Sequence, residues 1–146
     1  MTEKPGPKFS HEERLEQAAG NWWALHGAII DYLRELGHSP QAFSERLGER
    51  FAPGWEAGCE NLQQIAYYAA LHPVSLGAEL RGYDVGDDEA TVRLRLPTFA
   101  TEMSSSEHVK LLSDTYRAIM DHLDIDYKWE RDSDVFTFRL RRRAED

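Results

Sequence analysis

The chain is poor in cysteine, with only Cys59 among its 146 residues. One cysteine cannot close an intramolecular disulfide, and it cannot supply a zinc site built from several thiolates. Proteins without disulfides are typical of a reducing compartment, so we expect a cytoplasmic protein.

Long hydrophobic runs are also absent. No stretch approaches the roughly 20 apolar residues of a membrane-spanning helix, so we predict no membrane segment. Residues 1–10 include Lys4, Pro5, Pro7 and Lys8 and have no apolar run, so we expect no signal peptide. The composition predicts a flexible tail over residues 1–9 and a single domain over 10–146.

Positive charge is scarce as well. The chain has 17 Lys and Arg against 26 Asp and Glu, a formal net charge of −9. Neutralising phosphates requires a basic surface, so we predict that the protein is no general nucleic-acid binder. An anionic membrane surface would repel it for the same reason.

The common catalytic signatures are missing too. Neither GxxxxGK[ST] nor GxGxxG occurs, which argues against the usual nucleotide sites, and GxSxG is absent. The six histidines include no HxxxH or HExxH pair, and the acidic clusters lack the EF-hand pattern. We therefore predict no cofactor and no metal.

Helical periodicity dominates the first half of the chain. A strong apolar pattern runs from Ser10 to Leu36, and between Gly20 and Ile30 it is apolar or small nearly all round, which predicts a central helix. Ser39 and Pro40 signal the start of a second helix, which Pro53 should break. A third helix is expected over residues 55–71.

Alternation with a period of two follows. Residues 90–96 predict a half-buried strand, and residues 76–85 predict its hairpin partner across a three-residue turn. This register sets Leu80 opposite Leu94 and Gly82 opposite Val92, and it turns Arg81 and Tyr83 outward. 

A fourth helix is expected over residues 104–123, with a capping box formed by Ser104 and Glu107. His108 and His122 should face solvent. Ile125, Tyr127 and Trp129 then face Phe136, Phe138 and Leu140 in a last hairpin, across an even-length turn. The order of three helices, hairpin, helix and hairpin predicts an α+β fold with an antiparallel sheet.

An aromatic pocket is the leading candidate site. His26 lies on the apolar helix beside Trp22 and Trp23, and a buried imidazole needs hydrogen-bond partners. Such a partner could be a ligand, a metal, or simply a tyrosine or backbone group of a neighbouring helix. We expect a ligand site lined by Trp22, Trp23, His26, Tyr67 or Tyr68, and Phe99.

Arginines gather on the outer face of the predicted sheet, despite the negative net charge. Arg81 would lie opposite Arg93, which is unfavourable unless an anion lies between them, and Asp126 would lie opposite Arg139. A solvated face paired with nearby acids is the alternative to an anion-binding or partner-binding surface. The residues concerned are Arg81, Arg93, Arg95, Lys128, Arg139 and Arg141.

The order of elements resembles the small ligand-binding domains of the vinyl-reductase type and the related vesicle-trafficking (TRAPP) subunits. The loop Pro97-Thr98-Phe99-Ala100 and the closing residues 134–139 are also similar to an aminothiazoline-carboxylate hydrolase group. That group has a cysteine where Leu96 stands here, so the resemblance does not support thiol hydrolysis. It implies a hydrophobic small-molecule pocket between helices and hairpins.

Three functions follow from these patterns. The first is a non-catalytic or sensory small-molecule-binding domain that forms a homodimer, with a hydrophobic or anionic ligand. The second is a small hydrolase-like enzyme that uses Glu102, His26 or Cys59. The third is an interaction module that uses the arginine-rich sheet face.

Overall fold

The computed structural model describes residues 5–97 and 106–144. It contains four described helices and a four-stranded antiparallel sheet with strand order β1-β2-β4-β3, which confirms the predicted α+β class. The elements are α1 (His11–Glu35), α2 (Pro40–Gly58), α3 (Leu62–Ser75), β1 (Glu79–Val85), β2 (Glu89–Arg95), α5 (Ser106–His122), β3 (Ile125–Asp132) and β4 (Val135–Arg142).

The ends of α1 are set by local signals. The Ser10 side chain accepts a hydrogen bond from the Glu13 backbone, and the Glu13 carboxylate accepts one from the Ser10 backbone, forming a capping box. Gly37 follows the helix with a φ of 76°, a conformation that glycine adopts readily.

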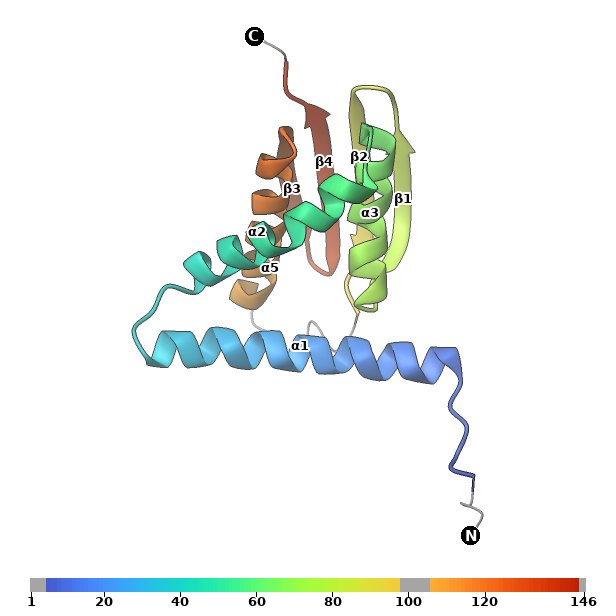
Figure 1. Cartoon of the computed structure of the whole chain (residues 1–146), viewed down its shortest axis with the longest axis vertical. Coiled ribbons are helices and arrows are strands. Elements are labelled where there is room, and N and C mark those ends of the chain that lie inside the picture. Colours follow the sequence, from blue (N-terminus) through green and yellow to red (C-terminus); the bar gives the residue numbers. More distant parts are fainter. Residues whose placement is uncertain (1–4, 98–105, 145–146) are drawn as a thin grey trace.

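The prediction that α1 is the central helix is wrong. Only one of its faces is buried, and Figure 1 shows it lying across one end of the molecule, away from the sheet. The apolar residues on the other faces of α1 remain largely exposed. A central position in the fold therefore does not explain why the helix is apolar nearly all round.

The predicted break at Pro53 is also wrong, because α2 continues through this residue to Gly58. Proline removes one backbone hydrogen bond from a helix and costs about 3 kcal/mol. Ala52 and Trp55 are both buried on either side of Pro53, and their packing offsets that cost. The chain leaves the helix at Cys59, and Asn61 caps α3 by accepting a hydrogen bond from the Gln64 backbone.

The crossing of α2 and α5 is the tightest helix contact. A Cβ atom added at Gly48 would lie 2.5 Å from the Thr115 carbonyl oxygen and 2.6 Å from the Ala118 Cβ. Only glycine fits there. This crossing places α5 between α2 and the sheet, so α5 is buried on two sides.

The first hairpin departs from its predicted register. Leu80 does pair with Leu94, but a β-bulge at Arg81 sets Gly82 opposite Arg93 and Tyr83 opposite Val92. A bulge adds one residue to one strand and so reverses the alternation beyond it. Tyr83 therefore shares the face of Val92, and Arg81 does not lie opposite Arg93.

The second hairpin follows its prediction in the main respect. The even turn keeps the six predicted aromatic and aliphatic residues on one face, five of them buried and Trp129 half-buried. The turn is two residues shorter than expected, however, because Asp132 pairs with Val135. Asp126 therefore lies opposite Arg141 and not opposite Arg139.

One face of the sheet forms the core. Helices α3 and α5 cover this face, which carries Ala90, Val92, Leu94, Phe136, Phe138 and Leu140 (Figure 1). The opposite face carries Arg93 and Arg95 of β2 and Arg139 and Arg141 of β4. Among the described residues, no helix is long and apolar enough to cross a membrane.

Candidate functional site

The junction of α1 and α5 brings together polar side chains that are distant in sequence. His26 and Gly27 lie on the buried face of α1, and His108 lies in the first turns of α5. A Cβ atom at Gly27 would lie only 3.3 Å from Nδ1 of His108. The glycine therefore allows the imidazole of His108 to approach the α1 backbone.

His26 is buried, with 4% of its surface exposed. Its ring stacks on the indole of Trp22, with ring centroids 4.8 Å apart and an interplanar angle of 11°. Trp22 is half-buried and so lies between His26 and the surface on this side. An edge contact of 5.2 Å between ring centroids joins Trp22 in turn to Trp23.

Neither ring nitrogen of His26 has a hydrogen-bond partner among the described residues. A neutral imidazole carries one N–H donor and one acceptor nitrogen, and burying such groups unpaired costs on the order of 1–3 kcal/mol. Burial, and secondly the proximity of His108, lower the pKa of His26 from its ordinary 6.5 to about 4. His26 is therefore neutral at pH 7, with both nitrogens able to bind a further group.

His108 lies beside this histidine with an acidic partner. Its Nε2 atom is 2.8 Å from Oδ1 of Asp31, one turn along α1 from His26 and Gly27. The prediction that His108 faces solvent is wrong, because 6% of its surface is exposed. The reason is the double burial of α5, whose second face packs toward α1 and α2. His122, at the other end of α5, is exposed as predicted.

An apolar cavity lies in the core, and its walls include neither His26 nor His108. Its volume is about 20 Å³, room for a body the size of one water molecule. Trp23 and Val109, the chain neighbours of Trp22 and His108, both contribute to its walls. Its other walls are Pro73, Leu76, Ala78, Leu94, Leu96, Leu112, Ser113, Tyr116, Phe136 and Phe138.

The other predicted pocket residues within the described ranges have different surroundings. Trp23 belongs to the core, where its indole Nε1 donates to the Leu76 carbonyl oxygen at 2.9 Å. Tyr67 is 58% exposed on α3, in an edge contact with Tyr68. Phe99 and Glu102 fall outside the described residues. The structure thus joins His26 and Trp22 to His108, which sequence reasoning assigned to solvent; Gly27 was the available signal of a close approach.

The candidate thiol has no activating partner in the described part of the chain. Cys59 is half-buried at the end of α2, and burial raises its pKa, which disfavours the nucleophilic thiolate. The imidazole of His72, later on the next helix, lies with Nδ1 2.6 Å from the Tyr116 hydroxyl. These contacts give no support to a Cys59 nucleophile.

Most arginines of the outer sheet face have acidic neighbours. For Arg93, by contrast, no ion pair occurs within the described ranges, and it borders a shallow hollow with Arg81 and Arg131. The pairs elsewhere on the face are Arg81–Glu79 at 3.4 Å, Arg95–Asp134 at 2.8 Å, Arg139–Glu130 at 3.6 Å and Arg141–Glu89 at 3.6 Å.

The acidic cluster after α5 is occupied by an arginine. The guanidinium of Arg143 lies 2.7 Å from Asp121, 3.0 Å from Asp126 and 3.8 Å from Asp124. Residues 5–97 and 106–144 contain no group of three or more His, Cys, Asp or Glu side chains arranged to hold a metal ion.

No protein-family model matches the chain, and no curated protein matches it. Among solved structures it is similar to a trafficking protein particle complex subunit 3 from Naegleria fowleri, covalently bound to palmitic acid. The identity is 11%, the match covers 87% of this chain and 96% of that chain, and the TM-score is 0.49. At this identity and TM-score we take neither a family nor a function from the similarity. The vinyl-reductase and aminothiazoline-carboxylate hydrolase resemblances stay predictions.

Proposed function

We propose that the protein is a small-molecule-binding domain that works as a homodimer, with the polar group of its ligand held by His26. The observation that carries the proposal is the buried imidazole whose two nitrogens have no partner among the described residues. Natural proteins keep buried polar groups paired, and exceptions of this kind are concentrated at functional sites.

The chemistry of the site restricts the ligand. Neutral His26 offers one donor and one acceptor, which fits a carboxylic acid, a hydroxyl or an amide. The apolar cavity in the core, which Trp23 and Val109 line and His26 does not, favours a ligand that also has a hydrophobic part. Its present volume fits only a water-sized group, so a larger hydrophobic part requires side chains to move.

The charge of the ligand has a measurable signature. A carboxylate next to His26 would favour the imidazolium and raise its lowered pKa, so binding would take up a proton and weaken as the pH rises. A neutral ligand would bind without this dependence. The pH dependence of binding therefore separates the anionic from the purely hydrophobic alternative.

Native mass spectrometry of the purified protein and a thermal-shift panel of small carboxylates and hydrophobic compounds test the proposal. A ligand present at 100 times its Kd stabilises a protein by about 2.7 kcal/mol, which the thermal shift detects. We expect His26→Leu to abolish the response. His38→Leu, which replaces an exposed histidine next to the end of α1, is the matched control and should retain it.

Two results would contradict the proposal. The first is a wild-type protein that carries no bound species and responds to no compound of the panel. The second is a saturable response that His26→Leu leaves unchanged, because the ligand would then bind at another place.

A further inference from the structure

Helix α1 carries a second apolar stripe beside its buried face. Seven residues alternate at spacings of three and four from Leu15 to Leu36, the residue that caps α1, and so occupy the a and d positions of a heptad repeat. They are Leu15, Ala18, Trp22, Leu25, Ile29, Tyr32 and Leu36. We call this set the α1 seam.

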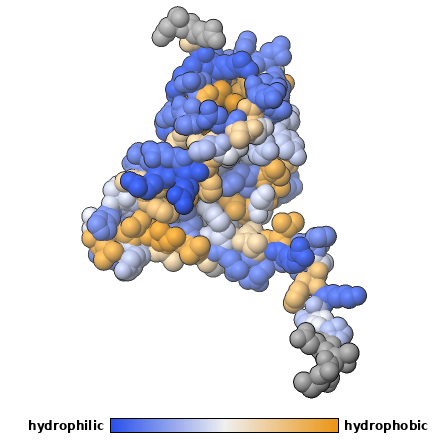
Figure 2. Space-filling view, viewed as in Figure 1, coloured by the Kyte–Doolittle hydropathy of each residue, from blue (hydrophilic) through white to orange (hydrophobic). Residues whose placement is uncertain are grey.

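The α1 seam is largely uncovered in the described chain. Leu15 and Leu25 are each 60% exposed, Tyr32 is 61% exposed and Leu36 is 53% exposed. Figure 2 shows hydrophobic residues gathered at the end of the molecule where α1 leads into α2. Contiguous apolar surface of this kind marks an interaction site.

The heptad period of the α1 seam indicates that its partner is another helix. A repeat of 3.5 residues keeps one face of a helix against another helix over several turns, and α1 is about 37 Å long. Another α1 offers a seam with the same period and length. A two-fold axis would bring identical surfaces together, as in most homodimers.

The charged residues beside the α1 seam favour one relative direction of the two α1 helices. Arg14 and Glu35 lie at equivalent heptad positions on the same edge of the α1 seam, near its opposite ends. No ion pair occupies either of them in the part of the chain that the structure describes. An antiparallel arrangement sets Arg14 of each copy beside Glu35 of the other, twice per dimer.

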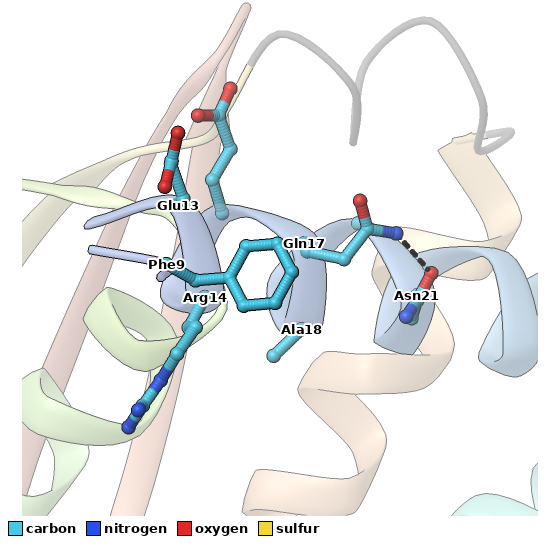
Figure 3. Close-up of a pocket in the computed structure, with 8 residues that line it drawn as sticks. Phe9, Glu13, Arg14, Gln17, Ala18 and Asn21 are labelled. Atoms are coloured by element: carbon cyan, nitrogen blue, oxygen red, sulfur yellow. Dashed lines mark hydrogen bonds between the residues drawn. The ribbon is translucent and has the colours of Figure 1, made fainter. Parts of the chain in front are cut away.

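We infer that two copies of this chain pair through an antiparallel contact between their α1 helices. In the register that the charges favour, Leu15 meets Tyr32, Ala18 meets Ile29 and Trp22 meets Leu25 of the second copy. A hollow lies along the first half of α1 at Ala18 and Asn21, with Phe9 and Arg14 at its border (Figure 3). The small side chain of Ala18 leaves room there for Ile29 of the second copy.

This inference rests on the homodimer part of the proposed function and names its surface. It does not depend on ligand binding. Leu25 is exposed and belongs to the α1 seam, so a substitution there changes the dimer surface first.

Sedimentation velocity over a wide range of protein concentration measures the dimer. We expect wild type to be a dimer that dissociates on dilution, and Leu25→Asp to be a folded monomer at every concentration. The matched control is Leu71→Asp, a leucine that is 40% exposed on α3, and it should leave the dimer unchanged. Circular dichroism verifies that each variant is folded.

Charge reversal tests the direction without removing apolar surface. Arg14→Glu alone and Glu35→Arg alone should each raise the dimer Kd roughly tenfold, since each change affects two symmetric pairs. The double variant should restore the wild-type Kd. Single reversals without effect, or without rescue in the double variant, would overturn the antiparallel contact.

The remaining outcomes separate the inference from the proposed function. A wild-type protein that is monomeric at all concentrations would overturn the homodimer together with its surface. A dimer that persists in Leu25→Asp would overturn the α1 contact and leave the homodimer standing.

Discussion

His26→Leu should make the protein less sensitive to acid, and the size of the effect follows from the buried imidazole. The pKa of His26 is 6.5 when the chain is unfolded and about 4 when it is folded. Between these values the unfolded state binds a proton that the folded state does not, so stability falls as the pH falls through 6.5 and levels off below 4. His108 and Asp31 are the titratable groups that share the junction with it.

When the pH is lowered from 8 to 5, it ends 1.5 units below the pKa that His26 has in the unfolded chain. At about 1.36 kcal/mol per unit, His26 alone should destabilise wild type by about 2 kcal/mol over this range. Other groups contribute to the absolute slope, His72 among them, since burial lowers its pKa as well. The difference between wild type and His26→Leu isolates the contribution of His26.

Urea unfolding followed by circular dichroism at several pH values between 8 and 5 gives the two stability curves. We expect them to converge or cross toward low pH, with a relative change of about 2 kcal/mol in favour of the variant. The exposed His38→Leu variant should run parallel to wild type. Curves for wild type and His26→Leu that stay parallel within about 0.5 kcal/mol would refute the lowered pKa and the unpaired burial that causes it.

Three further outcomes are expected. Gly48→Ala should lose roughly 1–3 kcal/mol or more in urea unfolding, because the added carbon would lie 2.5 Å from a backbone oxygen of α5; Gly54→Ala, with nothing within 4 Å, should be neutral or stabilising. Tyr127→Phe should lower the free energy of unfolding by about 1–2 kcal/mol in the same measurement. The buried hydroxyl of Ser113, 2.8 Å away on α5, would lose its hydrogen-bond partner. If the arginine-rich sheet face binds a partner, reversing the charges of Arg93 and Arg95 should reduce its recovery in a pull-down and leave ligand affinity at His26 unchanged. Equal recovery of all proteins by the variant would remove that surface from consideration.

Local signals made both ends of α1, the start of α2 and the inward face of the second hairpin predictable. The third helix, expected over residues 55–71, begins later and ends later than predicted. The capping box of Ser10 and Glu13 involves residues three apart, and the inward set of the last hairpin follows from strict alternation. Pro53 shows the limit of such reasoning, because the packing of Ala52 and Trp55 against other elements outweighs a local helix breaker. The bulge at Arg81 likewise has no strong local signal beyond the adjacent Gly82.

The candidate site was predictable only in part, because its two halves come from helices far apart in the chain. His26 stands out in the sequence as a polar residue on an apolar helix. His108 does not, since its burial depends on the crossing at Gly48 and on the gap left by Gly27. Side-chain contacts between α1 and α5 follow from the tertiary arrangement, which periodicity alone does not determine.

The bulge at Arg81 also bears on how the protein avoids self-association in the wrong geometry. β1 is an edge strand, and its Leu80 and Tyr83 side chains are exposed. A regular edge strand with such side chains would readily pair with a strand of another chain. The extra residue breaks the even spacing of free backbone donors and acceptors, and it adds a charged side chain to the rim. An incoming strand can therefore align with only one side of the irregularity at a time. At the β1 edge, the bulge therefore disfavours the addition of a fifth strand in register.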